Sequence, residues 1–224
     1  MDIIRTFFRI IGSVVCHQLP ERTLLVGGAP LPFCARDTGI YLGFFLGWMY
    51  LGIKNKHKAD APPGLGLTAV LCLLMLPMLI DGGTSYLGLR NTTNEIRLFT
   101  GTFFGMSLPY VLIPAANFKI YARNENRVID HLSDLVLPLA SALVICLVIL
   151  KTQLLPWILV AGICTGSFVF CVYRIVYTVT VRVVHGRLKK IRIMAAGITI
   201  LILGLMYLIS SLILQPLKNI LLKI

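Results

Sequence analysis

The sequence has little charge, and acidic residues are especially scarce. Only 13% of its 224 residues are charged, and Asp and Glu together number 9, whereas about 25% of a typical soluble domain is charged. Hydrophobic residues make up 57% of the chain, and the mean hydropathy is +0.86. Because a soluble protein of this size could not bury so much apolar surface, the composition predicts an all-α, polytopic transmembrane helical bundle.

Several function classes lack their usual motifs. The sequence has no phosphate-binding glycine loop, no local Ser/His/Asp motif and no C-x-x-C pair, and aromatic residues are only 9%. The net charge of +12 comes from Lys and Arg that lie between apolar runs, with no basic groove along which phosphates could lie. This pattern excludes nucleic acid as a partner and indicates the lipid bilayer instead.

Six apolar runs predict membrane spans, and several of them are near the short limit of about 17 residues for crossing a bilayer. They cover residues 38–53, 64–80, 98–114, 135–150, 154–173 and 193–214. A shorter run at 3–15 carries Arg5 and Arg9, and we expect a retained seventh, N-terminal segment; an interfacial helix and a cleaved signal are the alternatives. We interpret residues 1–224 as a single membrane domain, with a motif-bearing half at 1–105 and a scaffold half at 106–224.

The loop charges predict an orientation in the cell membrane. Segments 54–63, 115–134 and 174–192 together hold 12 of the 21 Lys and Arg residues, and such basic loops are typically cytoplasmic. Segments 16–37 and 81–97 fall on the opposite face, where acidic and basic residues balance. We therefore expect a cytoplasmic N-terminus and extracytoplasmic motif loops.

Small residues recur at four-residue spacing inside the predicted spans, which indicates close helix packing in lipid. These residues are Gly39, Gly43 and Gly47 in one span, Gly101 and Gly105 in another, and Gly162 and Gly166 in a third.

Four possible metal ligands lie at the two ends of one loop: Cys16, His17, Cys34 and Asp37. Thiolate, imidazole and carboxylate groups all suit zinc, and close pairs along the chain are a usual way to build a tetrahedral site. The alternatives are a Cys16–Cys34 disulfide, which an extracytoplasmic location permits, and an Asp37 that only caps the following helix.

Asp81 directly follows the predicted span at 64–80 and precedes Gly82-Gly83, where we expect that helix to end. A carboxylate at a helix C-terminus is unfavourable unless a cation or a metal compensates it. Ionisable residues near a membrane core are candidates for function, so we predict that Asp81 is a catalytic base or a further metal ligand. A structural ion pair is the alternative.

A substrate site is predicted on the same face. Thr92-x-x-Glu95 matches a capping box, so a helix should begin near Thr93, and on this helix Asn94 and Arg97 share a face. Basic side chains and helix N-termini together favour an anionic ligand such as a phosphate or a carboxylate. The predicted substrate-binding residues are Arg36, Arg90, Asn94 and Arg97; a purely structural polar network is the alternative.

Four ordered motifs resemble a family of bacterial and archaeal membrane proteins called domain of unknown function 2085. The motifs are C-H-Q-L-P-E-R-T, C-A-R-D-T-G-I-Y, P-M-L-I-D-G-G-T and R-N-T-T-N-E-I-R-L-F-T-G, and they cover roughly residues 16–105. In that family the second motif usually reads C-x-R-C, so a cysteine would stand where this chain has Asp37, and a Gln is usual where this chain has Ser85. The resemblance implies membership and no particular activity.

Three functions are consistent with these residues. The leading hypothesis is a metal-dependent membrane enzyme, with zinc as the possible cofactor, that acts on a lipid or another anionic substrate at the extracytoplasmic face. The first alternative is a small transporter or channel that uses the same polar site. The second is a structural or assembly protein with a Cys16–Cys34 disulfide.

Overall fold

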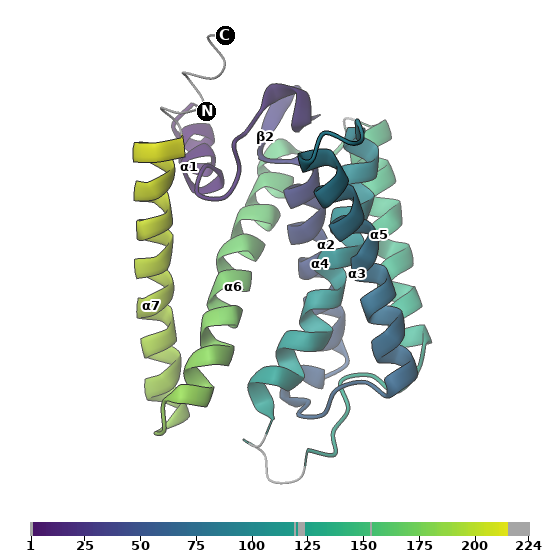
Figure 1. Cartoon of the computed structure of the whole chain (residues 1–224), viewed down its shortest axis with the longest axis vertical. Helices are drawn as coiled ribbons and strands as arrows, with labels where there is room; N and C mark the ends of the chain where they lie inside the picture. Colours follow the sequence, from purple (N-terminus) through teal and green to yellow (C-terminus); the bar gives the residue numbers. More distant parts are fainter. Residues whose placement is uncertain (1, 119, 121–123, 153, 215–224) are drawn as a thin grey trace.

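The structure is a computed structural model that describes residues 2–118, 120, 124–152 and 154–214. Within these residues the chain forms seven α-helices and a two-stranded antiparallel sheet. Helices α2 to α7 lie side by side along one axis (Figure 1), which confirms the predicted all-α, polytopic bundle.

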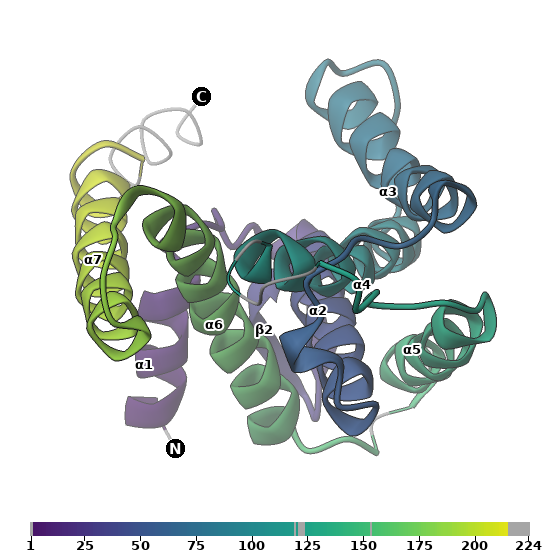
Figure 2. The same cartoon turned by 90° about the horizontal axis from the view of Figure 1, so that it is seen from below.

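Every predicted span is a helix. The helices are α2 (Ala35–Ile53), α3 (Leu65–Tyr86), α4 (Asn94–Asn117), α5 (Ser133–Lys151), α6 (Trp157–Val183) and α7 (Leu188–Ile209). Among the described residues, α3 to α7 are five helices long and apolar enough to cross a membrane. The 19-residue α2 carries two charged side chains in its first turn and lies at the centre of the bundle (Figure 2).

Most helices are longer than the apolar runs that predict them, because polar residues continue the helix at its ends. The predicted loop at 174–192 is the clearest correction. Helix α6 continues to Val183, and the Arg174 guanidinium carbon lies over the rings of Trp48 at 4.7 Å and Tyr177 at 5.1 Å. An arginine held over two aromatic rings fits the end of a membrane helix, where such side chains reach toward the interface.

The N-terminal segment forms α1 (Asp2–Gly12), which is too short to cross a bilayer. Its 11 residues rise about 16 Å, roughly half the thickness of the hydrocarbon core. Its side chains Ile3, Phe7 and Ile10 are exposed, as expected of an interfacial helix. Figure 1 shows α1 at the same end of the bundle as the hairpin that follows it; the side of the membrane on which the N-terminus lies stays a prediction.

The contact between α2 and α4 has two of the predicted glycine stripes on its facing sides. A methyl group on Gly39 would collide with the Leu98 carbonyl, and one on Gly105 would collide with the Ile40 carbonyl. Because these glycines have no side chain, the backbones of α2 and α4 can approach each other closely. The stripe in α6 is different: Gly162 and Gly166 have open space on this side among the described residues, so the predicted close packing there is wrong.

Candidate metal and anion site

A β-hairpin carries the second cysteine back to the first. Strands β1 (Thr23–Val26) and β2 (Ala29–Cys34) pair antiparallel, and the two turn residues, Gly27 and Gly28, have φ of +55° and +73°. Positive φ at both positions is the geometry of a tight two-residue hairpin turn, which glycine adopts without strain. The Gly-Gly pair was a usable hairpin signal that the sequence interpretation missed.

The loop between α1 and the hairpin holds Cys16 in place through Gln18. Gln18 adopts a left-handed φ of +50°, which is uncommon for a residue with a side chain. Its side-chain amide donates to the carbonyls of Arg9 at 2.8 Å and Pro32 at 2.9 Å. Its backbone N–H points at the Cys16 Sγ, 3.4 Å away. Gln18 therefore joins α1, the loop and β2 around the Cys16 sulfur.

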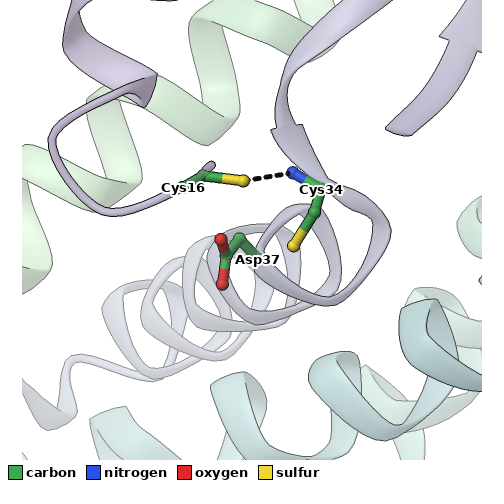
Figure 3. A group of neighbouring side chains, drawn as sticks. All are labelled: Cys16, Cys34 and Asp37. Carbon is green, nitrogen blue, oxygen red and sulfur yellow. Dashed lines mark hydrogen bonds between the residues drawn. The ribbon is translucent and has the colours of Figure 1, made fainter. Parts of the chain in front are cut away.

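Three of the four predicted metal ligands come together. The ligand atoms of Cys16, Cys34 and Asp37 all lie within 4.8 Å of one another, and Figure 3 shows the three side chains around one space at the start of α2. The Cys34 backbone N–H donates to the Cys16 Sγ at 3.1 Å. Cys34 precedes α2, and Asp37 lies in its first turn, so the start of one helix sets two of the ligands.

Both cysteines are free thiols, and their contact makes them unequal. The hydrogen bond with Cys34 lowers the pKa of the Cys16 thiol, against the opposing effect of burial. The same contact, together with burial, raises the pKa of Cys34. The thiolate is the form of a cysteine that binds metals.

His17 lies beside this group without joining it. It lines the same cavity, but its ring nitrogens are not among the three atoms that cluster. Its role as a fourth ligand stays a prediction.

Asp81 has a defined partner. Its Oδ2 accepts a hydrogen bond from Arg36 Nη2 at 2.5 Å, and the two side chains are 3% and 11% exposed. Helix α3 continues to Tyr86, so the predicted helix end at Gly82-Gly83 is wrong, and Asp81 lies inside the helix. The Arg36 charge compensates the buried carboxylate.

Arg97 and Asn94 also form a pair, as their shared helix face predicted. Arg97 Nη1 donates to the Asn94 side-chain oxygen at 3.3 Å, and the Asn94 amide donates to the Glu21 carbonyl at 3.1 Å. The helix start needs one correction. Thr93 is the N-cap and accepts from the Ile96 N–H at 3.4 Å, one residue later than a capping box at Thr92 would place it.

A cavity of about 210 Å³ adjoins the three ligands. Its walls come from the loop after α1, the start of α2, the last turns of α3 and the first turn of α4. The predicted residues that line it are Cys16, His17, Cys34, Arg36, Asp37 and Arg97. The other three predicted residues do not line it. Asp81 is hydrogen-bonded to Arg36, Asn94 is hydrogen-bonded to Arg97, and Arg90 is exposed in the α3–α4 connection.

Arg22 and Tyr86 complete the cavity, and the sequence interpretation gave neither a role. Arg22 ends η1 (Pro20–Arg22) and joins Arg36 and Arg97, so three arginines line one small space. Tyr86 lies 5.9 Å from the Arg36 guanidinium carbon. The charge of Arg22 and its place in the first motif were a usable signal, whereas no sequence signal marks Tyr86.

The part of the chain that forms this site is also the part that matches a known protein family. Residues 16–111 match a family described as "Predicted membrane protein (DUF2085)". An uncharacterised protein of Methanocaldococcus jannaschii is 33% identical over 112 residues, which are 50% of this chain and 69% of that protein. One of Methanothermobacter thermautotrophicus is 38% identical over 94 residues, 42% of this chain and 80% of that protein. No solved structure matches. The chain is therefore a multi-pass membrane protein of the DUF2085 family.

Proposed function

We propose that the protein is a metal-dependent membrane enzyme that acts on an anionic substrate in the cavity beside Cys16, Cys34 and Asp37. The observation that carries this proposal is the joint placement of three ligand atoms within 4.8 Å and three arginines on one cavity. A purely structural metal site has no need of a polar cavity beside it, because such sites are closed by four protein ligands.

The ligand set favours zinc. Two thiolates and one carboxylate are zinc ligands, and three protein ligands with an open fourth position are the pattern of catalytic zinc sites. The backbone N–H groups of Cys34 and Gln18 donate to the Cys16 sulfur, and such hydrogen bonds orient a ligand and stabilise its charge. A zinc ion held by Cys16, Cys34 and Asp37 would supply Lewis-acid chemistry and would lower the pKa of a bound water to about 7.

The arginines supply substrate binding. Arg22, Arg36 and Arg97 line the cavity, and guanidinium groups bind carboxylates and phosphates through paired hydrogen bonds. Asp81 does not line the cavity. Its ion pair with Arg36 therefore supports a role in positioning that arginine rather than a role as a base that acts on the substrate.

The proposed location is the extracytoplasmic face of the cell membrane. The basic connections α2–α3, α4–α5 and α6–α7 lie at the other end of the bundle (Figure 1), and basic loops favour the cytoplasmic side. Tagging the loop at 87–93 for modification by an impermeant reagent in intact cells tests this assignment; protection of that loop until the membrane is opened would contradict it.

Metal analysis of the purified chain tests the metal. We expect about one zinc per chain in the wild type. Cys16→Ser should weaken zinc binding by more than the roughly 10–100-fold that follows loss of a group that only hydrogen-bonds a ligand. Asp37→Cys, which restores the family's usual C-x-R-C motif, should strengthen it. Cys72→Ser is the matched control, because Cys72 is an exposed thiol of α3 away from the cluster.

Two outcomes would overturn the proposal that the chain binds a metal. One is wild-type protein without stoichiometric metal. The other is wild-type protein in which a thiol reagent labels Cys16 and Cys34 only after reduction. That result would identify the pair as a disulfide and favour the assembly protein.

A further inference from the structure

The α3 wall of the cavity is open where the other walls are packed. Gly82 lines the cavity, and a methyl group added to it would meet no atom within 4 Å among the described residues. This differs from the glycines between α2 and α4, which are needed for close packing. A glycine inside a helix costs about 1 kcal/mol of stability relative to alanine. At Gly82 this glycine leaves free space in the wall and does not serve a close helix contact.

The arginines on the inner side of the cavity have donor groups that remain available to bind an anion. Arg36 is 9% exposed, and its Nε is buried without a hydrogen-bond partner among the described residues. Arg22 and Arg97 form no ion pair within the described part of the chain. Guanidinium groups that lack a carboxylate partner in a concave space favour an anion with several oxygens, which points to a phosphate group.

The outer side of the same wall is exposed and apolar, as expected of a membrane helix that faces lipid. Helix α3 stands at the edge of the bundle and packs mainly on α4 (Figure 2). Its outward side chains are exposed and apolar: Leu73, Leu76, Leu79 and Ile80. These residues lie within about two and a half turns of Gly82 along the helix, so acyl chains on this face would end beside the open part of the wall.

The size of the cavity limits what it can hold. At about 210 Å³, it is smaller than the roughly 300–1,000 Å³ that encloses a whole small-molecule ligand. It can therefore take a headgroup while the rest of an amphiphile stays in the bilayer. Tyr86, which is 76% exposed, stands at this boundary, where aromatic residues are favoured.

We infer that the substrate is an amphiphile with a phosphate-bearing headgroup, which enters the cavity from the bilayer between α3 and the loop after α1, past Gly82 and Tyr86. This inference rests on the proposed function and adds the class of substrate and its route. The arginines bind the phosphate beside the metal ligands, and the acyl chains remain against the outward face of α3.

The inference is tested by comparing the binding of two ligands, phosphatidic acid and inorganic phosphate, to the full-length protein in detergent. Binding is followed by native mass spectrometry and titration. We expect phosphatidic acid to bind at least about tenfold more tightly, because the acyl chains add apolar contacts. Gly82→Val should weaken phosphatidic acid about tenfold and leave inorganic phosphate within about twofold. Arg97→Gln should weaken both.

Gly66→Val is the matched control. Gly66 lies on the same helix with equal free space around it, but it is remote from the cavity, so this substitution should leave both ligands unchanged. Equal weakening of both ligands by Gly82→Val, no effect on either, or preferential binding of inorganic phosphate by the wild type would overturn the lipid route.

Metal content measured on the same samples separates the two proposals. Zinc-loaded protein that binds neither phosphate refutes the inference and leaves the metal site standing. Protein without metal refutes the proposed function whether or not the lipid binds.

Discussion

The two faces of α4 differ in how closely they pack. On one face α4 meets α2, and glycines on both helices bring the backbones together. On the other face it meets α3, whose glycines have free space around them. The first contact makes a rigid frame for the start of α2, where Cys34 and Asp37 lie. The second leaves free space at Gly82, where α3 forms a wall of the cavity. The proposed function would need both, a frame that holds the metal ligands and a wall that admits a substrate.

The ion pair between Arg36 and Asp81 links α2 to α3. Asp81→Leu would leave the Arg36 charge buried and unpaired, and breaking such a pair costs about 3–5 kcal/mol. We expect the largest loss of thermal stability here. In the double variant Arg36→Met/Asp81→Leu much of the loss should be recovered, because apolar residues of similar size often replace a buried pair at little cost. A double-mutant cycle in detergent measures this, and additive losses would contradict it.

Gly105→Ala tests the close contact. The added methyl group would meet the Ile40 backbone, which cannot rotate away, so α2 and α4 must separate. Overpacking of this kind costs about 1–3 kcal/mol, or roughly 2–10 °C in Tm for a chain of this length. Because the movement would also displace Asp37, zinc binding should weaken in parallel. Unchanged Tm and zinc affinity would show that the frame is not rigid.

Thr93→Ala tests the start of α4, which lies between the two contacts. The Thr93 hydroxyl accepts the Ile96 N–H, and loss of such a cap costs about 1 kcal/mol. Thr92→Ala is the control and should have little effect, because Thr93 and not Thr92 is the N-cap. The reverse order of the two Tm values would restore the capping box at Thr92.

Gly82→Ala and Gly162→Ala should have the smallest effects and the opposite sign to Gly105→Ala. Neither added methyl group meets another atom among the described residues, and alanine favours a helix by up to about 1 kcal/mol over glycine. Both variants should therefore keep or slightly raise Tm. A marked fall at Gly82 would mean that the α3 wall is as tightly packed as the α2 contact.

The helices were predictable because hydrophobic periodicity and length depend on local sequence. All six apolar runs became helices, and the α2–α4 stripe followed from four-residue glycine spacing. The ends were less predictable, since α3 passes through Gly82-Gly83 and α6 passes through Arg174. In both cases a partner from another helix stabilises what the local sequence disfavours: Arg36 for Asp81, and Trp48 for Arg174.

The site was only partly predictable for a similar reason. Residue types alone marked Cys16, Cys34 and Asp37 as possible ligands, and these three cluster. The partner of Asp81 was open among several cations, and Arg22 and Tyr86 carried no assigned role. Those answers depend on how the hairpin and the end of α3 meet.

By itself the sequence determined that this is a helical membrane protein and that its polar residues gather in the first half. Both follow from composition and short-range spacing, which fix where a helix can exist and what lipid excludes. The tertiary structure alone decided that α1 stays on the side of the motif loops, that Arg36 pairs with Asp81, and that three arginines share one cavity with the thiols. These are contacts between residues far apart in the chain, and no local spacing specifies them.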